Sequence, residues 1–292
     1  MEELKRKYLY GSLAAFLSAV GFGSLPIFAV NAYNEGVNVL SLLTFRFVIS
    51  AIILGIINLK KFDFKEIIDY NYFGLILIGL TYAIFNFSYF TAFNMIPTSL
   101  AALIFYTYPI LVAVLAWLFG QERIGFRKAV AVFIAFTGIY LVYSDFQIVA
   151  SVPGIVAAFS ASLFYAFYIL GGNHLLSDTL FLHVVFITCT VSAIIFTGIG
   201  VFRGELSFQY GINVYIYLIL ITLISLVSLI LFLYGLKNTT PTVASVISMA
   251  EPVVTVLLSF LLLAEVFSLI QYAGAFMILL ASFYIVLAKK EN

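Results

Sequence analysis

Ten long apolar runs constrain this chain more than any other feature of its sequence. Each run holds 18 to 24 residues, and a helix of roughly 20 apolar residues crosses the hydrocarbon core of a bilayer. Strands of a membrane barrel would be near ten residues long and would alternate polar with apolar side chains. The runs therefore predict an all-α integral membrane protein with ten transmembrane helices. The predicted helices are residues 8–31, 39–58, 72–93, 98–119, 127–144, 153–172, 180–202, 213–236, 241–263 and 268–288.

The composition excludes several other classes of protein. With 64% hydrophobic and 9% charged residues and a mean hydropathy of +1.17, the chain has too few charges to cover a soluble domain. A net charge of +1 without a basic stripe argues against a nucleic-acid partner. The single cysteine, Cys189, excludes an internal disulfide and a cysteine metal cluster. We expect a lipid bilayer as the surroundings, and neither a cofactor nor a metal.

The basic residues predict how the helices are oriented. The first run is longer than the apolar part of a signal peptide, so we expect it to be retained as the first span. With the amino terminus inside, twelve of the fourteen basic residues lie on the cytoplasmic side, against Arg203 alone outside; Arg46 lies within the second span. Lysines and arginines near span ends favour the cytoplasm, so both termini are predicted to be cytoplasmic in a multi-pass protein of the cytoplasmic membrane.

An internal repeat divides the ten predicted spans into two halves. Gly11 recurs as Gly154, and Pro109 recurs as Pro252, both 143 residues later. Each half has five spans, and because five is odd the second half begins on the opposite side of the membrane. Such inverted repeats are common in secondary transporters, whose binding site lies midway at the interface of the halves. The predicted halves are residues 1–146 and 147–292.

Short motifs spread over nearly the whole chain add to this pattern. They are the Gly- and Ser-rich stretch 11–26, Phe45-Arg46-Phe47, residues 94–103, Tyr108-Pro109 with Gly120-Gln121-Glu122-Arg123, and Glu251-Pro252 with Ala264-Glu265. Together with the ten spans and the repeat, they resemble the drug/metabolite transporter superfamily, specifically its EamA-type family with two five-helix inverted repeats. The resemblance implies transport of a small molecule through a central cavity by alternating access, with efflux of amino acids or similar metabolites a common role. Phe22 stands where that family commonly has a tryptophan, so a relative's substrate should not be copied to this chain.

Glu251 is the acid that lies in the middle of an apolar run. A carboxyl group at that depth must be paired, protonated or exposed to water. Pro252 cannot donate to the carbonyl of Ser248, so the helix should bend or open at Glu251, and Pro109 should have the same effect in the first half. Tyr108 occupies the position in the first half that is equivalent to Glu251 in the second half, so the symmetry of the fold does not require an acid there. Glu251 either binds an amine or carries a proton, or it is a structural acid held by a neighbouring helix.

Arg46 is the second charged residue predicted inside the membrane. Its depth and that of Glu251 differ by about one or two helical turns. A pair across the cavity would lessen the cost of burying both charges, and its opening and closing could accompany transport. The alternative is a structural Arg46 that bonds carbonyl groups or extends toward the interface.

Aromatic and polar side chains supply the remaining candidates for substrate binding. Tyr82, Asn86 and Tyr89 share one face of the third span, and Ser248 shares a face with Glu251. A buried phenol needs a hydrogen-bond partner, so several tyrosines should face water or substrate. The predicted substrate-binding residues are Glu251, Tyr82, Asn86, Tyr89, Tyr106, Tyr108, Tyr165 and Ser248.

Glu122, Glu265 and the two histidines have other predicted roles. Glu122 and Glu265 end the fourth and ninth spans, where we expect them to cap a helix or bond loop amides, with gating as the alternative. His174 and His183 have no second histidine or carboxylate at metal-binding spacing, so neither is predicted to bind a metal.

The sequence leaves three functions open. The leading one is a secondary transporter or facilitator, acting as a monomer, that exports a small amphipathic metabolite such as an amino acid, including an aromatic one. Its energy coupling stays open between antiport with protons and uncoupled facilitation. An importer of an organic cation would share the same fold. An integral-membrane enzyme acting on a lipid is disfavoured, because the interior acids amount to one and no phosphate loop or nucleophile motif occurs.

Overall fold

The computed structural model describes residues 2–61, 71–93, 95–96, 98–143, 151–176, 181–263 and 268–287. These residues form α-helices and no β-strand. The helices of the first half are α1 (Glu2–Asn34), α2 (Val39–Lys61), α4 (Tyr72–Phe93), α5 (Thr98–Phe105), α6 (Tyr108–Leu118) and α7 (Phe126–Val142). Those of the second half are α8 (Val152–Leu175), α9 (Phe181–Arg203), α10 (Ile212–Asn238), α11 (Pro241–Ser248), α12 (Glu251–Leu263) and α13 (Leu269–Leu287).

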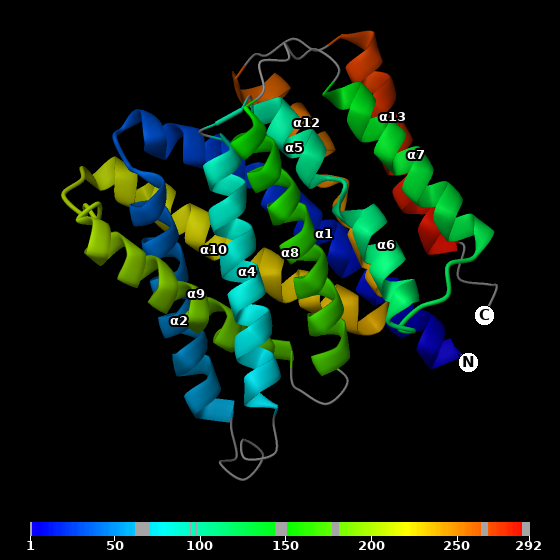
Figure 1. The fold of residues 1–292 in the computed structure, drawn as a ribbon, viewed down its shortest axis with the longest axis horizontal. Coiled ribbons are helices and arrows are strands. Elements are labelled where there is room, and N and C mark those ends of the chain that lie inside the picture. Colours follow the sequence, from blue (N-terminus) through cyan, green and yellow to red (C-terminus); the bar gives the residue numbers. More distant parts are fainter. Residues whose placement is uncertain are drawn as a thin grey trace.

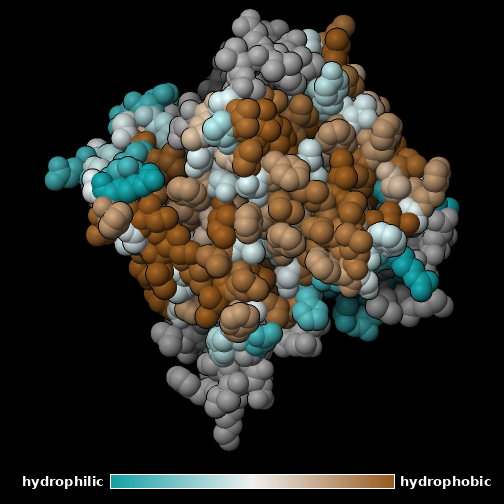
Figure 2. Space-filling model, viewed as in Figure 1, coloured by the Kyte–Doolittle hydropathy of each residue, from teal (hydrophilic) through white to brown (hydrophobic). Residues whose placement is uncertain are grey.

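The all-helical, multi-spanning architecture agrees with the sequence. Within the described residues, nine spans are long and apolar enough to cross a membrane. The remaining predicted span, residues 127–144, corresponds to α7, which has 17 residues and lies at the lower limit for a transmembrane helix. Apolar side chains cover most of the visible face of the bundle (Figure 2), as contact with lipid requires. The start of α1 and the end of α13 lie at the same side of the bundle (Figure 1); their cytoplasmic location stays a prediction.

Two predicted spans are each divided into two helices. Residues 106–107 separate α5 from α6, and residues 249–250 separate α11 from α12. Pro109 and Pro252 are the second residues of α6 and α12. The N–H groups in the first turn of a helix have no intrahelical acceptor, so a proline at this position loses no hydrogen bond. The predicted opening at Glu251 is therefore confirmed, and it is a complete break with Glu251 as the first residue of α12.

The contacts between the halves repeat when the halves are exchanged. The most extensive contacts are those of α1 with α10 and of α4 with α8, and these two pairs are equivalent when the halves are exchanged. The other two extensive pairs, α7 with α13 and α2 with α9, each map onto themselves. Figure 1 shows α4 beside α8 and α7 beside α13. The predicted boundary between residues 146 and 147 lies outside the described residues.

Helices α7 and α13 cross with their backbones in contact. A Cβ atom added at Gly138 would lie 2.7 Å from the carbonyl oxygen of Gly274, and one added at Gly274 would lie 2.6 Å from that of Gly138. Only glycine at both positions permits this approach, as at other close crossings of membrane helices.

Gly138→Val is therefore expected to lower the stability of the bundle. The added side chain must push the two backbones apart, and overpacking of this kind costs about 1 to 3 kcal/mol. Thermal unfolding in detergent should show a clearly lower Tm for this variant. Gly198→Ala on α9 is the control, because a Cβ there meets nothing within 4 Å; equal Tm values for the two variants would contradict the close crossing.

Candidate functional site

A cavity of about 1090 Å³ lies between the two halves of the bundle. Its walls come mainly from the second half of α1, the beginning of α2 and the second half of α4, with contributions from α5 and α12. Because α1 starts on the side of the termini, these segments lie toward the opposite side. Arg203 and Glu205, both about half exposed, belong to the lining. The cavity thus opens on the side away from the termini.

Most of the predicted site residues line this cavity. Those in the lining are Glu251, Tyr82, Asn86, Tyr89, Tyr106, Tyr165 and Arg46. Tyr108 and Ser248 do not line it and are buried in the protein. The Tyr108 hydroxyl donates instead to the carbonyl oxygen of Ser245 at 3.2 Å. Tyr108 therefore connects α6 of the first half with α11 of the second, close to both helix breaks.

Glu251 is positioned by direct packing of α1 on the break between α11 and α12. A Cβ atom added at Gly23 would lie 2.5 Å from the Glu251 carbonyl oxygen. The Thr255 hydroxyl lies 2.7 Å from the Gly23 carbonyl oxygen and 3.1 Å from that of Glu251. Tyr106 is a hydrogen-bond partner of the Glu251 side chain. Glu251 is the first residue of α12, so its carboxyl group is held at the cavity wall.

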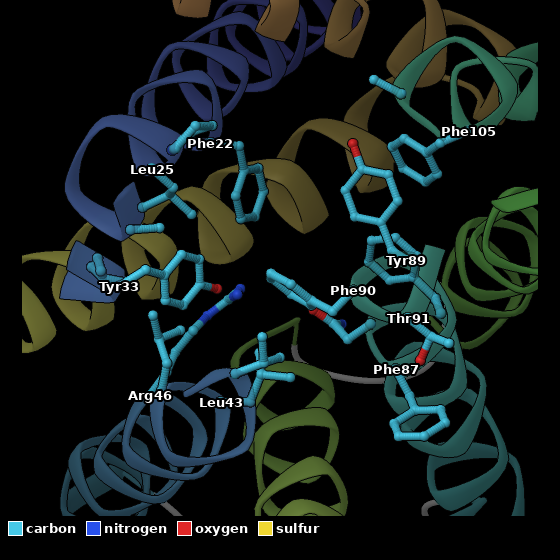
Figure 3. A pocket seen from close by; sticks show the side chains of 18 of the residues that line it. Phe22, Leu25, Tyr33, Leu43, Arg46, Phe87, Tyr89, Phe90, Thr91 and Phe105 are labelled. Carbon is cyan, nitrogen blue, oxygen red and sulfur yellow. The ribbon is translucent and has the colours of Figure 1, made fainter. Parts of the chain in front are cut away.

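An aromatic wall covers one side of the cavity. Phe105 lies between Tyr89 and Phe85, with ring centroids 4.4 and 5.3 Å away, and Tyr165 lies 4.6 Å from Phe85. Asn86 donates to the carbonyl oxygen of Tyr82 at 2.8 Å. Figure 3 shows Tyr89, Phe90 and Phe105 on one side, facing Phe22, Tyr33 and Arg46 on the other.

Arg46 does not form the predicted ion pair with Glu251 in this structure. Within the described residues, ion pairs join Lys7 to Glu3, Lys128 to Glu122 and Arg203 to Glu205. Arg46 is only 8% exposed, and its guanidinium carbon lies 4.8 Å from the centroid of the Phe47 ring. Its side chain extends into the cavity toward Tyr33 (Figure 3). The two interior ionisable residues thus line one cavity without forming an ion pair with each other.

Glu122 joins the two halves on the side of the termini. Its carboxylate accepts hydrogen bonds from the Thr240 hydroxyl at 2.7 Å and from the Thr242 amide at 3.1 Å, and it pairs with Lys128 at 2.6 Å. The predicted capping role is correct, but the capped helix is α11 of the other half. Glu265, the equivalent residue, lies outside the described residues.

The packing of α11 closes the bundle on this side. Helix α11 contacts α6, α7 and α13, whereas its counterpart α5 has no contact of similar extent with α7 or α13 among the described residues. The symmetry between the halves is therefore broken at the cavity, which is open at the α5 end and closed at the α11 end.

Several lining residues were not singled out by the sequence. Tyr33, Phe85 and Tyr143 line the cavity, but each stands in an aromatic-rich stretch where periodicity does not distinguish it from packing residues. Phe22, the departure from the family pattern, also lines the cavity. Within the described residues, no group of three His, Cys, Asp or Glu side chains could hold a metal ion.

Comparison with known proteins places this architecture in a family. The model of the EamA-like transporter family matches the chain twice, over residues 9–144 and 152–287. The chain belongs to the EamA-like transporter family. The two matches cover the two halves of this EamA protein, and they agree with the repeat seen in its helix contacts.

Solved structures share the fold of this EamA protein. One chain, from a crystal structure described only as that of a protein, superposes with a TM-score of 0.82 at 16% sequence identity, covering 97% of this chain and 99% of its own. At that identity the likeness establishes the fold alone. A search of curated protein sequences gives no match.

Proposed function

We propose that this EamA-family protein is a secondary transporter or facilitator for a small amphipathic metabolite, with an amino acid as the best candidate, including an aromatic one. The supporting observation is the cavity between the halves, which combines the Glu251 carboxylate with an aromatic wall. A carboxylate binds an ammonium group, and aromatic faces bind cations and apolar side chains. Such a cavity suits a solute with a charged amine at one end and an apolar body at the other.

Alternating access is the mechanism that the broken symmetry supports. Exchanging the packing of α5 and α11 would close the open side and open the side of the termini, since the two helices occupy equivalent places in the repeats. With both termini in the cytoplasm, the present cavity would face outward. We propose efflux across the cytoplasmic membrane by a monomer, with protons exchanged at Glu251 as the coupling reaction.

A second candidate is uptake of an organic cation. Glu251 among aromatic rings would also suit a quaternary amine, and the same fold permits either direction. The third alternative, an enzyme acting on a lipid, has less support, because an acid-based reaction would call for clustered acids and Glu251 is the single carboxylate deep in the described cavity.

Counterflow in proteoliposomes tests the proposal. Vesicles preloaded with phenylalanine and containing the purified protein should accumulate labelled phenylalanine faster than protein-free vesicles, because exchange through an alternating site is stimulated by substrate on the far side. Arg203→Gln at the mouth is the control variant and should retain exchange. Counterflow with a quaternary amine but with no amino acid would favour the organic-cation alternative, and counterflow with neither would contradict transport of amphipathic amines.

A further inference from the structure

Arg46 is a buried cation that has no counter-charge among the described residues. The described residues give it no hydrogen bond and no ion pair, whereas Lys128, whose side chain is 16% exposed, pairs with Glu122 at 2.6 Å. A guanidinium group carries five N–H donors, and burying such a charge without partners is costly. The Phe47 ring, 4.8 Å away, stabilises one face of the group but accepts none of its in-plane hydrogen bonds.

The surroundings of Arg46 leave its donors directed toward the cavity. Its electrostatic neighbours are the phenols of Tyr33 and Tyr82, and all three residues line the cavity. Figure 3 shows the Arg46 side chain extending from α2 into the space between Tyr33 and Phe90. A structural arginine would instead bond carbonyl groups at a helix end, and no such bond occurs in the part of the chain that is described. The missing partner is therefore to be sought in a ligand.

Planar anions fit this group best. The guanidinium fork matches the two oxygens of a carboxylate and forms two parallel, charge-assisted hydrogen bonds. Glu251 lines the same cavity, and its carboxyl group can pair with an ammonium group but gives no charge partner to a phosphate dianion or any solute that carries only negative charge. A solute with both a carboxylate and an ammonium group satisfies Arg46 and Glu251 together.

We propose that Arg46 is the carboxylate-binding residue of the cavity, and that Arg46 with Glu251 makes the site selective for zwitterions over simple amines and simple acids. This assignment rests on the proposed transport function and narrows its substrate to solutes that carry one carboxylate and one ammonium group, with the apolar body against the aromatic wall. It also explains how Arg46 and Glu251 can line one cavity without an ion pair, because the substrate supplies a charged partner for each of them.

Binding of three related probes to the purified protein tests the assignment. L-Phenylalanine carries both charged groups, 2-phenylethylamine lacks the carboxylate, and 3-phenylpropionate lacks the ammonium group. Isothermal titration of the wild type should show the tightest binding for phenylalanine. Arg46→Gln should weaken binding of phenylalanine and 3-phenylpropionate by about tenfold to 100-fold, as expected for loss of a charge-assisted contact, and should leave 2-phenylethylamine unchanged. Arg46→Lys should restore part of the loss.

The possible outcomes separate this assignment from the proposed function. Equal affinity of the wild type for phenylalanine and 2-phenylethylamine would overturn it without any variant, and so would an equal loss for all three probes in Arg46→Gln. Absence of binding for all three probes would overturn it as well. Exchange of phenylalanine that is unaffected by Arg46→Gln would leave transport standing and reject the subsite. Arg46-dependent binding of 3-phenylpropionate without transport of any solute would support the subsite and reject the proposed function.

Discussion

Glu251→Gln is expected to reduce exchange of phenylalanine by about 30-fold or more, because removing one partner of a buried charge pair costs about 2 to 5 kcal/mol. Glutamine keeps the size of the side chain but loses the charge that would hold the substrate ammonium group. Counterflow in proteoliposomes measures the loss. The variant should also abolish substrate-driven pH changes if Glu251 carries the coupled proton.

Glu205→Gln is the matched control for this prediction. Glu205 also lines the cavity, but its side chain is 49% exposed at the mouth, where water screens its charge. Exchange by this variant should be close to that of the wild type. Full proton coupling in Glu251→Gln would remove Glu251 from the mechanism and favour uncoupled facilitation.

Replacing Glu122 is expected to have the largest effect on stability. The Glu122 side chain is 3% exposed and its partner Lys128 is 16% exposed, so Glu122→Ala leaves a largely buried ammonium group without a counter-charge. The change also removes the cap from the Thr242 amide at the start of α11. Breaking a buried pair from one side costs about 3 to 5 kcal/mol, and thermal unfolding in detergent should show a correspondingly low Tm.

The pair Lys7–Glu3 serves as the control for Glu122. Its side chains are 61% and 82% exposed, and exposed pairs of this kind contribute little. Glu3→Ala should leave the Tm unchanged. A double variant with Lys128→Met should recover part of the stability lost in Glu122→Ala, because no buried charge then remains unpaired. Equal Tm values for Glu122→Ala and Glu3→Ala would contradict the closing role of Glu122.

The helices and their breaks could be predicted because their causes are local. A run of about 20 apolar residues specifies a span by its length, and Pro109 and Pro252 specify a break by the missing N–H. The repeat was visible as a constant offset of 143 residues. Predicting these features does not require knowing which helices pack against each other.

The sequence could not predict how side chains are directed around the cavity. Tyr106 and Tyr108 stand two residues apart, but the break at residues 106–107 leaves Tyr106 in the lining and turns Tyr108 toward Ser245. Depth along the membrane placed Arg46 near Glu251 without giving their lateral positions, and the described residues show no ion pair between the two in this structure. The contact between Glu122 and Thr240 joins residues 118 positions apart, which no local pattern indicates.

Labelling of a single cysteine in the cavity tests most directly whether the substrate binds there. Thr91 lines the cavity, and Thr91→Cys in a Cys189→Ala background provides one reactive thiol. A membrane-impermeant maleimide added on the side away from the termini should label it, and a transported solute should slow this labelling. Gln209→Cys, exposed in the segment between α9 and α10 and outside the cavity lining, is the control, and the solute should not alter its reaction. Labelling of Thr91→Cys that a transported solute leaves unchanged would contradict substrate binding in this cavity.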